Sequence, residues 1–78
     1  MTIGERINSR RRELGLTQDE VAKKTGVALQ TIFKYENNII SDIPIDKIKK
    51  LAKALNVNEA WLIGFDVPQD RNKQAYRL

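Results

Sequence analysis

The chain has 78 residues, a length that suits one small domain, and it contains neither cysteine nor histidine. Disulfides, the usual zinc sites and every histidine-dependent catalytic triad are therefore excluded, and a reducing compartment fits best. Fourteen Lys and Arg against ten Asp and Glu give a formal net charge of +4, a weak indication of an anionic partner.

Membrane and enzyme functions find no support in the sequence. No apolar run reaches the about 18 residues that could span a bilayer, and no apolar segment follows a basic start, so we expect a cytoplasmic protein. Ser9 and Ser41 have no base to activate them, and neither a carboxylate cluster nor a glycine-rich phosphate loop is present. We therefore expect no catalytic residue, no metal site and no cofactor.

Residues 2–14, "TIGERINSRRREL", have the pattern of a first helix. Ile3, Ile7 and Leu14 keep one face apolar, and Thr2 stands three residues before Glu5 as a capping box. The glycine that follows ends the helix.

Residues 17–26, "TQDEVAKKTG", repeat this pattern and predict a second helix. Thr17 is its N-cap with Glu20 three residues later, Val21 and Ala22 face inward, and Gly26 is the C-terminal stop. The two lysines are expected to face outward.

A third helix is predicted over residues 29–37, joined to the second by the short turn "TGVA". This is the spacing of a helix-turn-helix unit, whose second helix can lie in the major groove of DNA. Val27, Ile32 and Tyr35 form a narrow stripe that predicts core packing. The residues that this leaves facing away are Ala28, Leu29, Gln30, Thr31, Phe33 and Lys34.

Pro44 is suited to the first turn of a fourth helix, and Asn58 to the N-cap of a short fifth helix, "EAWLI", that Gly64 closes. The apolar stripe of the fourth helix comprises Ile45, Ile48, Leu51, Ala52 and Leu55. We place a domain at residues 1–66 and interpret residues 67–78 as a polar tail or the start of an interdomain linker.

Two strings, "IGERINSRRRELGLTQDEVAKKTGVALQTIFKYEN" and "IDKIKKLAKALNVNEAWLIG", resemble the Cro/cI-type (XRE-like) helix-turn-helix family of phage repressors and bacterial regulators. The resemblance covers about residues 3–65. It implies an all-α, five-helix, lambda-repressor-like domain with a central helix-turn-helix, in the bacterial cytoplasm. It also implies a homodimer that occupies double-stranded operator DNA and blocks a promoter.

Within this family the chain is most similar to the N-terminal DNA-binding domain of a temperate-phage repressor. There, a linker often leads to a C-terminal dimerisation domain, which is not part of these 78 residues. Two alternatives stay open: the chain is a fragment of a longer repressor, or it is a small Cro-like protein.

The resemblance places base contacts on the third helix. Gln30 can pair bidentately with adenine, and Lys34 can reach a guanine acceptor or a phosphate. Leu29 and Phe33 lack hydrogen-bonding groups, so in the groove they could only contact thymine methyl groups or exclude water. A half-buried Leu29 and a Phe33 packed on a neighbouring side chain are the alternatives. Ala28 departs from the family, where a Ser or Thr commonly caps this helix, and losing that cap should cost about 0.5–2 kcal/mol.

Phosphate contacts are expected at helix ends and in the following loop. Gln18 lies at the N-terminal end of the second helix, where free amides favour an anion, and in the family the matching glutamine also braces the recognition helix. Thr31 can donate to a phosphate or pack on a thymine methyl group. Asn37 and Asn38 could contact phosphate or form a turn. Thr17 completes the predicted DNA-binding set.

Glu36 is the only acid on the third helix, and the resemblance pairs it with Arg11 in a structural ion pair. A solvent-exposed Glu36, or competition from Arg10 or Arg12, is the alternative. The run of arginines at 10–12 points in directions about 100° apart on a helix, so we interpret it as one structural arginine with solvated neighbours.

Trp61, Phe65 and Val67 add large apolar groups near the end of the chain, where the family forms its two-fold contact. We expect them at a dimer interface, although core packing also accounts for Trp61. The alternative function is a protein-interaction module that binds an antagonist or co-repressor through the exposed apolar residues of the third helix.

Overall fold

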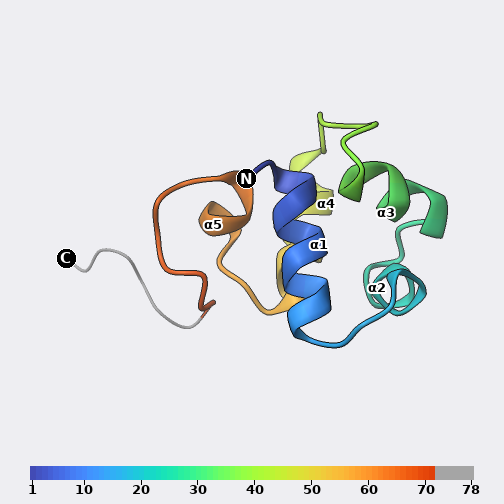
Figure 1. Cartoon of the computed structure of the whole chain (residues 1–78), viewed down its shortest axis with the longest axis horizontal. Helices are drawn as coiled ribbons and strands as arrows, with labels where there is room; N and C mark the ends of the chain where they lie inside the picture. The colour runs from blue at the N-terminus through green and yellow to red at the C-terminus, as the bar shows by residue number, and fades with distance from the viewer. Residues whose placement is uncertain (72–78) are drawn as a thin grey trace.

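The computed structural model describes residues 1–71 and contains five helices in that range. They are α1 (Ile3–Glu13), α2 (Gln18–Thr25), α3 (Leu29–Glu36), α4 (Ile45–Leu55) and α5 (Glu59–Ile63). The only β pairing among these residues is one isolated bridge between Val57 and Asp70. The predicted five-helix, all-α architecture is confirmed (Figure 1). No helix within residues 1–71 is long and apolar enough to cross a membrane.

The helix boundaries follow the local signals in the sequence. Thr2 with Glu5, and Thr17 with Glu20, form complete capping boxes at the starts of α1 and α2. Gly26 ends α2 with a φ of 75°, a left-handed conformation that glycine adopts without a steric penalty. These two helix starts and this stop are where the sequence predicts them.

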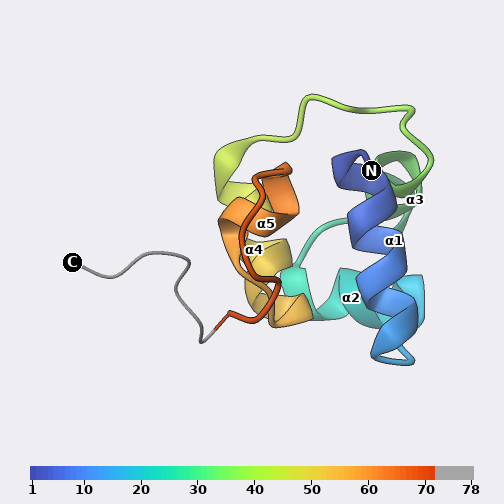
Figure 2. The ribbon, with the colours of Figure 1, turned by 60° about the vertical axis from the view of Figure 1, so that its left-hand side comes forward.

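All five helices contribute side chains to the core, with α3 packed on α1 and α2, and α5 packed on α1 and α4 (Figures 1 and 2). Two predicted core positions are wrong, because Leu14 and Ile45 are exposed. Leu14 is the C-cap of α1, where the helical spacing stops. Ile45 is the first residue of α4, and the buried Ile43 from the preceding loop fills that end of the core. The buried apolar residues are Ile7, Val21, Ala22, Val27, Ile32, Tyr35, Ile43, Ile48, Leu51, Ala52, Leu55, Val57 and Leu62.

The segment after α5 returns along the body of the domain, beside α5 and α4 (Figure 2). The Asn58 amide donates to the Gln69 carbonyl at 2.8 Å, and the Gln69 side chain donates to the Glu13 carboxylate at 3.2 Å. The predicted boundary after residue 66 stays a prediction, since residues 67–71 return to the domain and residues 72–78 lie outside the described part.

Candidate nucleic-acid interface

The turn between α2 and α3 is locked by hydrogen bonds around Thr25. Its buried hydroxyl donates to the Val21 carbonyl at 2.8 Å and accepts from the Val27 amide at 3.1 Å. The Gly26 amide donates to the Ala22 carbonyl at 2.8 Å. The turn therefore holds α3 at a fixed angle to α2.

Helix α3 has one buried face and one face open to solvent. Ile32 and Tyr35 are buried against α1 and α2, as the spacing predicts. Leu29 and Phe33 are 45% and 49% exposed, so neither is buried in the domain. The other residues of the open face are Ala28, Gln30 and Lys34, which are exposed, and Thr31, which is half-buried. In Figure 1, α3 lies at the edge of the molecule.

The N-terminal end of α3 is uncapped. Ala28 has the extended backbone of an N-cap residue, with φ −60° and ψ 143°, but no side chain bonds to the first-turn amides. These amides, together with the positive end of the helix dipole, favour a negatively charged group such as a phosphate. The open face of α3 thus begins at an end suited to an anion.

The C-terminal end of α3 is tied to the domain by Glu36, whose side chain is only 1% exposed. Arg11 Nε donates to Glu36 Oε2 at 2.7 Å and Arg11 Nη2 to Oε1 at 3.0 Å, which is the expected ion pair. Asn8 and Gln18 also donate to Oε1, at 2.7 and 3.1 Å. We call these four residues the Glu36 cluster. Asn8 was not predicted, because a single asparagine one turn before an arginine carries no distinctive pattern.

Hydrogen bonding sets the charge state of the Glu36 cluster. Burial alone would raise the pKa of Glu36, but hydrogen bonds from Arg11, Asn8 and Gln18 outweigh it and hold the pKa below its ordinary value. The same contact raises the pKa of Arg11. Both groups are therefore charged near neutral pH, and the Glu36 cluster links α1, α2 and α3.

The two residues expected to contact phosphate at the start of α2 are both engaged within the domain. The Thr17 hydroxyl accepts from the Glu20 amide at 3.0 Å. Gln18 gives one amide hydrogen to Glu36, and its second hydrogen is available for another acceptor because a primary amide carries two. Gln18 thus braces α3, and its phosphate contact stays a prediction.

Asn37 and Asn38 shape the turn after α3. Asn38 has a φ of 60°, its amide donates to the Tyr35 carbonyl at 3.2 Å, and its Oδ1 accepts from the Thr2 hydroxyl at 2.9 Å. The Asn37 side chain donates to the Phe33 carbonyl at 2.9 Å. Of the two alternatives for this pair, the turn-forming role is present, and phosphate contact stays a prediction.

The arginine run contains two structural arginines, so the interpretation of one with solvated neighbours is wrong for Arg10. Arg10 Nε donates to the Leu55 carbonyl at 2.9 Å, and its side chain is 18% exposed. Arg12 is exposed, as predicted. The sequence could not identify the role of Arg10, because its partner is a backbone carbonyl at the end of α4.

The predicted dimer residues lie in α5 and in the segment just after it. Trp61 is partly buried, Val67 is half-buried, and Phe65 is 61% exposed. Arg6, which the sequence did not indicate, lies over the Trp61 ring at 4.8 Å from its centroid. The exposed apolar surface at Phe65 is available to a second chain, and the dimer interface stays a prediction.

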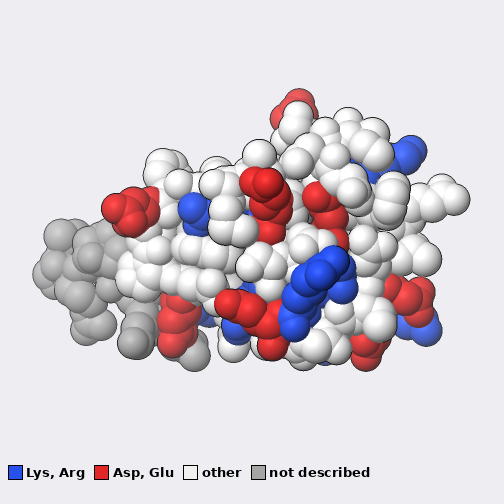
Figure 3. Space-filling view, viewed as in Figure 1, with Lys and Arg blue, Asp and Glu red and all other residues white. Residues whose placement is uncertain are grey.

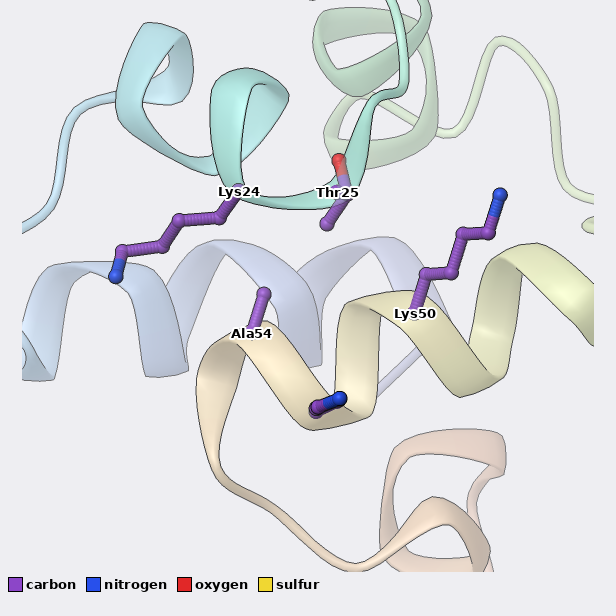
Figure 4. A pocket seen from close by; sticks show the side chains of 5 residues that line it. Lys24, Thr25, Lys50 and Ala54 are labelled. Atoms are coloured by element: carbon purple, nitrogen blue, oxygen red, sulfur yellow. The ribbon is translucent and has the colours of Figure 1, made fainter.

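A separate hollow of about 440 Å³ lies between α2 and α4, with Lys24, Lys50 and Lys53 at its rim. The side chains of Lys24 and Lys50 extend in opposite directions (Figure 4), so their charges do not converge on one point. Lys24 and Lys53 lie in the last turns of their helices, where a cation complements the helix dipole. The face in Figure 3 carries acidic and basic groups side by side and shows no large patch of one sign.

Comparison with known proteins matches this arrangement to one family. The family described as "Helix-turn-helix" matches residues 7–62. HTH-type transcriptional regulator ImmR from Bacillus subtilis (strain 168) is 30% identical over 73 residues, which cover 94% of this chain and 57% of ImmR. The chain thus spans little more than half the length of this relative.

Solved structures show the same fold. The N-terminal DNA-binding domain of SinR from Bacillus subtilis is 31% identical with a TM-score of 0.77, over 82% of this chain and 93% of that one. A SinR protein/SinI protein complex gives 32% identity and a TM-score of 0.77, over 81% and 61% of the two chains. The P22 c2 repressor in complex with a synthetic operator gives 29% identity and a TM-score of 0.76, over 85% and 98%.

Proposed function

The chain belongs to the helix-turn-helix family of DNA-binding transcriptional regulators, and from this premise we propose that it is a phage or prophage repressor that occupies an operator as a dimer. The observation that carries the proposal is the open face of α3, which follows a locked turn and begins at an uncapped helix end. A relative of the same fold, the P22 c2 repressor, is in complex with a synthetic operator. The proposed location is the bacterial cytoplasm, and the family is one of regulators, not enzymes.

The proposal places α3 in the major groove. Gln30 contacts the edge of an adenine bidentately, which gives about 1–3 kcal/mol of discrimination between bases. Lys34 contacts a guanine acceptor or a phosphate. Leu29 and Phe33 contact thymine methyl groups. The support for this assignment is that all four side chains are exposed on the side of α3 that no other helix covers.

Phosphate contacts set the position of the domain on DNA but carry no base preference themselves. The proposed groups lie at the ends of α2 and α3 and in the loop that follows, and nearby basic side chains add to them. They are Thr17, Gln18, the free amides at the helix end that Ala28 begins, Thr31, Asn37 and Asn38. Because no lysine or arginine occurs between residues 35 and 46, the loop can offer phosphates only neutral donors.

A dimer is proposed to form through Trp61, Phe65 and Val67. Two recognition helices then enter major grooves about 34 Å apart, or a multiple of this distance, and a bound operator that overlaps a promoter excludes polymerase. Since the chain spans 57% of ImmR, a C-terminal dimerisation domain in a longer protein is a further proposed contributor.

The test begins with selection of bound duplexes from a random pool. Affinities for the selected and a random duplex are then measured for Gln30→Ala and for Lys49→Ala, an exposed lysine on α4. Gln30→Ala should erode the preference for the selected duplex, whereas Lys49→Ala should at most lower both affinities alike. Unchanged discrimination in Gln30→Ala would show that α3 is not the reading helix.

A second candidate function is a protein-interaction module, which the exposure of Leu29 and Phe33 favours. The dependence of binding affinity on salt concentration distinguishes the two functions. Binding through several phosphates should weaken steeply between about 50 and 200 mM salt, while an apolar protein interface would barely respond. A flat salt profile would overturn the DNA-binding proposal and support the protein module.

A further inference from the structure

Helix α1 has one side that holds α3. Gly4, Asn8 and Arg11 recur at intervals of four and three residues, so they lie along one stripe of the helix. Gly4 packs directly on the Tyr35 carbonyl, leaving no space for a Cβ, and Asn8 and Arg11 both donate to Glu36. The position of the recognition helix is thus fixed by direct contacts to α1.

A second side of α1 holds the C-terminal helices. Arg6 Nη1 donates to the Trp61 carbonyl at 2.7 Å, and the guanidinium lies 4.8 Å from the centroid of the Trp61 ring. One turn later, Arg10 Nε donates to the Leu55 carbonyl at 2.9 Å. With only five residues, α5 is too short to be stable by itself, so its orientation depends on such contacts.

The arrangement of Arg6 is costly, which points to a specific role. Its Nε is buried without a hydrogen-bond partner among the described residues, although a buried polar atom normally has one. A freely oriented arginine would keep this nitrogen in water. Arg6 therefore holds its place through the Trp61 ring and carbonyl, the two contacts that orient α5.

From this geometry we propose that Arg6 is a positioning residue that fixes α5 on α1 and thereby sets the spacing between the two operator half-sites that a dimer accepts. The inference rests on the proposed function, in which α3 enters the groove and the α5 region forms the two-fold contact. Helix α1 contacts both elements, so a change in how α5 sits on α1 would shift the dimer contact relative to α3 and thereby alter the separation of the two recognition helices.

The test uses Arg6→Met, which keeps an apolar stem on Trp61 but removes the cation and the hydrogen bond. Affinities are measured for the selected palindromic duplex, for versions with one or two base pairs inserted or removed at its centre, and for a single half-site. We expect the wild-type protein to prefer one spacing, and this preference to fall about fivefold or more in Arg6→Met. The affinity for a single half-site should not change.

Controls separate the inference from a general loss of structure. Arg12→Met makes the same change at an exposed position of α1 and should keep the wild-type spacing profile. Fluorescence of Trp61, the single tryptophan, reports directly whether the stacking is lost. Arg6→Lys keeps a cation and is expected to fold, and it should relax the spacing preference less than Arg6→Met does. If Arg6→Met unfolds, Arg6→Lys is used as the test variant in its place.

The outcomes distinguish the inference from its premise. A wild-type protein that binds a palindrome no better than one half-site would overturn the proposed dimer. A wild-type protein with a clear spacing preference that Arg6→Met and Arg6→Lys both retain, despite altered Trp61 fluorescence, would overturn the role of Arg6 alone.

Discussion

Helices α2 and α3 have the same length of eight residues but are stabilised in opposite ways. α2 begins with the capping box of Thr17 and Glu20 and ends at Gly26 in the left-handed conformation, so its own sequence defines both ends. α3 begins at Ala28 without a cap, and contacts to other helices hold it. In the proposed DNA complex the first amides and the outer face of α3 contact DNA, and this proposal would account for the missing cap.

Removing Glu36 should give the largest effect, because the Glu36 cluster ties the C-terminal end of α3 to the domain. Glu36→Ala leaves Arg11 as a largely buried charge without its partner, at a cost of about 3–5 kcal/mol in the free energy of unfolding. Urea denaturation followed by circular dichroism measures the loss.

The matched control for this change is Glu13→Ala. Glu13 forms an ion pair with Arg10 on the same helix, but its side chain is 50% exposed, so the loss should stay within about 1 kcal/mol. Equal losses in the two variants would contradict the assignment of α3 stability to the Glu36 cluster.

Because of the Glu36 cluster, we expect the free energy of unfolding to depend on pH. Burial raises the pKa of Glu36, hydrogen bonds from Arg11, Asn8 and Gln18 lower it more, and the folded pKa is below the ordinary value of 4.5. The stabilisation is therefore fully present above that ordinary value and is lost as the pH falls through the lower, folded pKa.

Unfolding of the wild-type protein and of Glu36→Gln, compared between about pH 6 and pH 3, tests this dependence. The stability difference between them should shrink as the pH falls. Glu5 and Glu20, whose pKa values are also lowered by their capping hydrogen bonds, titrate alike in both proteins, so their effect cancels. A difference that stays constant would show that Glu36 does not titrate in this range.

Gly4→Ala should weaken the packing of α1 on α3 by a smaller amount. The new Cβ would overlap the Tyr35 carbonyl oxygen and lie 2.8 Å from Asn38 Oδ1, so the two helices must separate. We expect a loss of about 1–3 kcal/mol, measured by urea denaturation. Ser9→Ala changes α1 without this overlap and should differ from the wild-type protein by less than about 0.5 kcal/mol.

The comparison also shows what the sequence can predict. The sequence predicts both ends of α2 because Thr17, Glu20 and Gly26 act within a few residues of one another, at fixed offsets. The open and buried faces of α3 followed from helical spacing, and the partner of Glu36 came from the family resemblance. Local chemistry and periodicity thus define both helices of the unit.

The sequence does not predict contacts between a side chain and a backbone carbonyl that is distant along the chain. Arg6 and Arg10 bond to the carbonyls of Trp61 and Leu55, and a carbonyl is present at every residue, so no residue type marks the partner. The burial of Ile43 is not predictable from the sequence for a related reason, because a single apolar residue in a loop has no periodicity. The contacts that join α1 to α5 and to the end of α4 are therefore visible only in the three-dimensional structure.

Adding an N-cap to α3 and removing the N-cap of α2 should give the smallest changes in stability. Ala28 already has the extended backbone of an N-cap, so Ala28→Ser needs no rearrangement and should stabilise the domain, while Thr17→Ala should destabilise it, each by about 0.5–2 kcal/mol. Thermal unfolding measures both. The serine that stabilises α3 also occupies a first-turn amide, so the same variant should bind DNA less tightly if that amide contacts a phosphate. Greater stability with undiminished DNA affinity would mean that α3 is left uncapped for a reason other than phosphate binding.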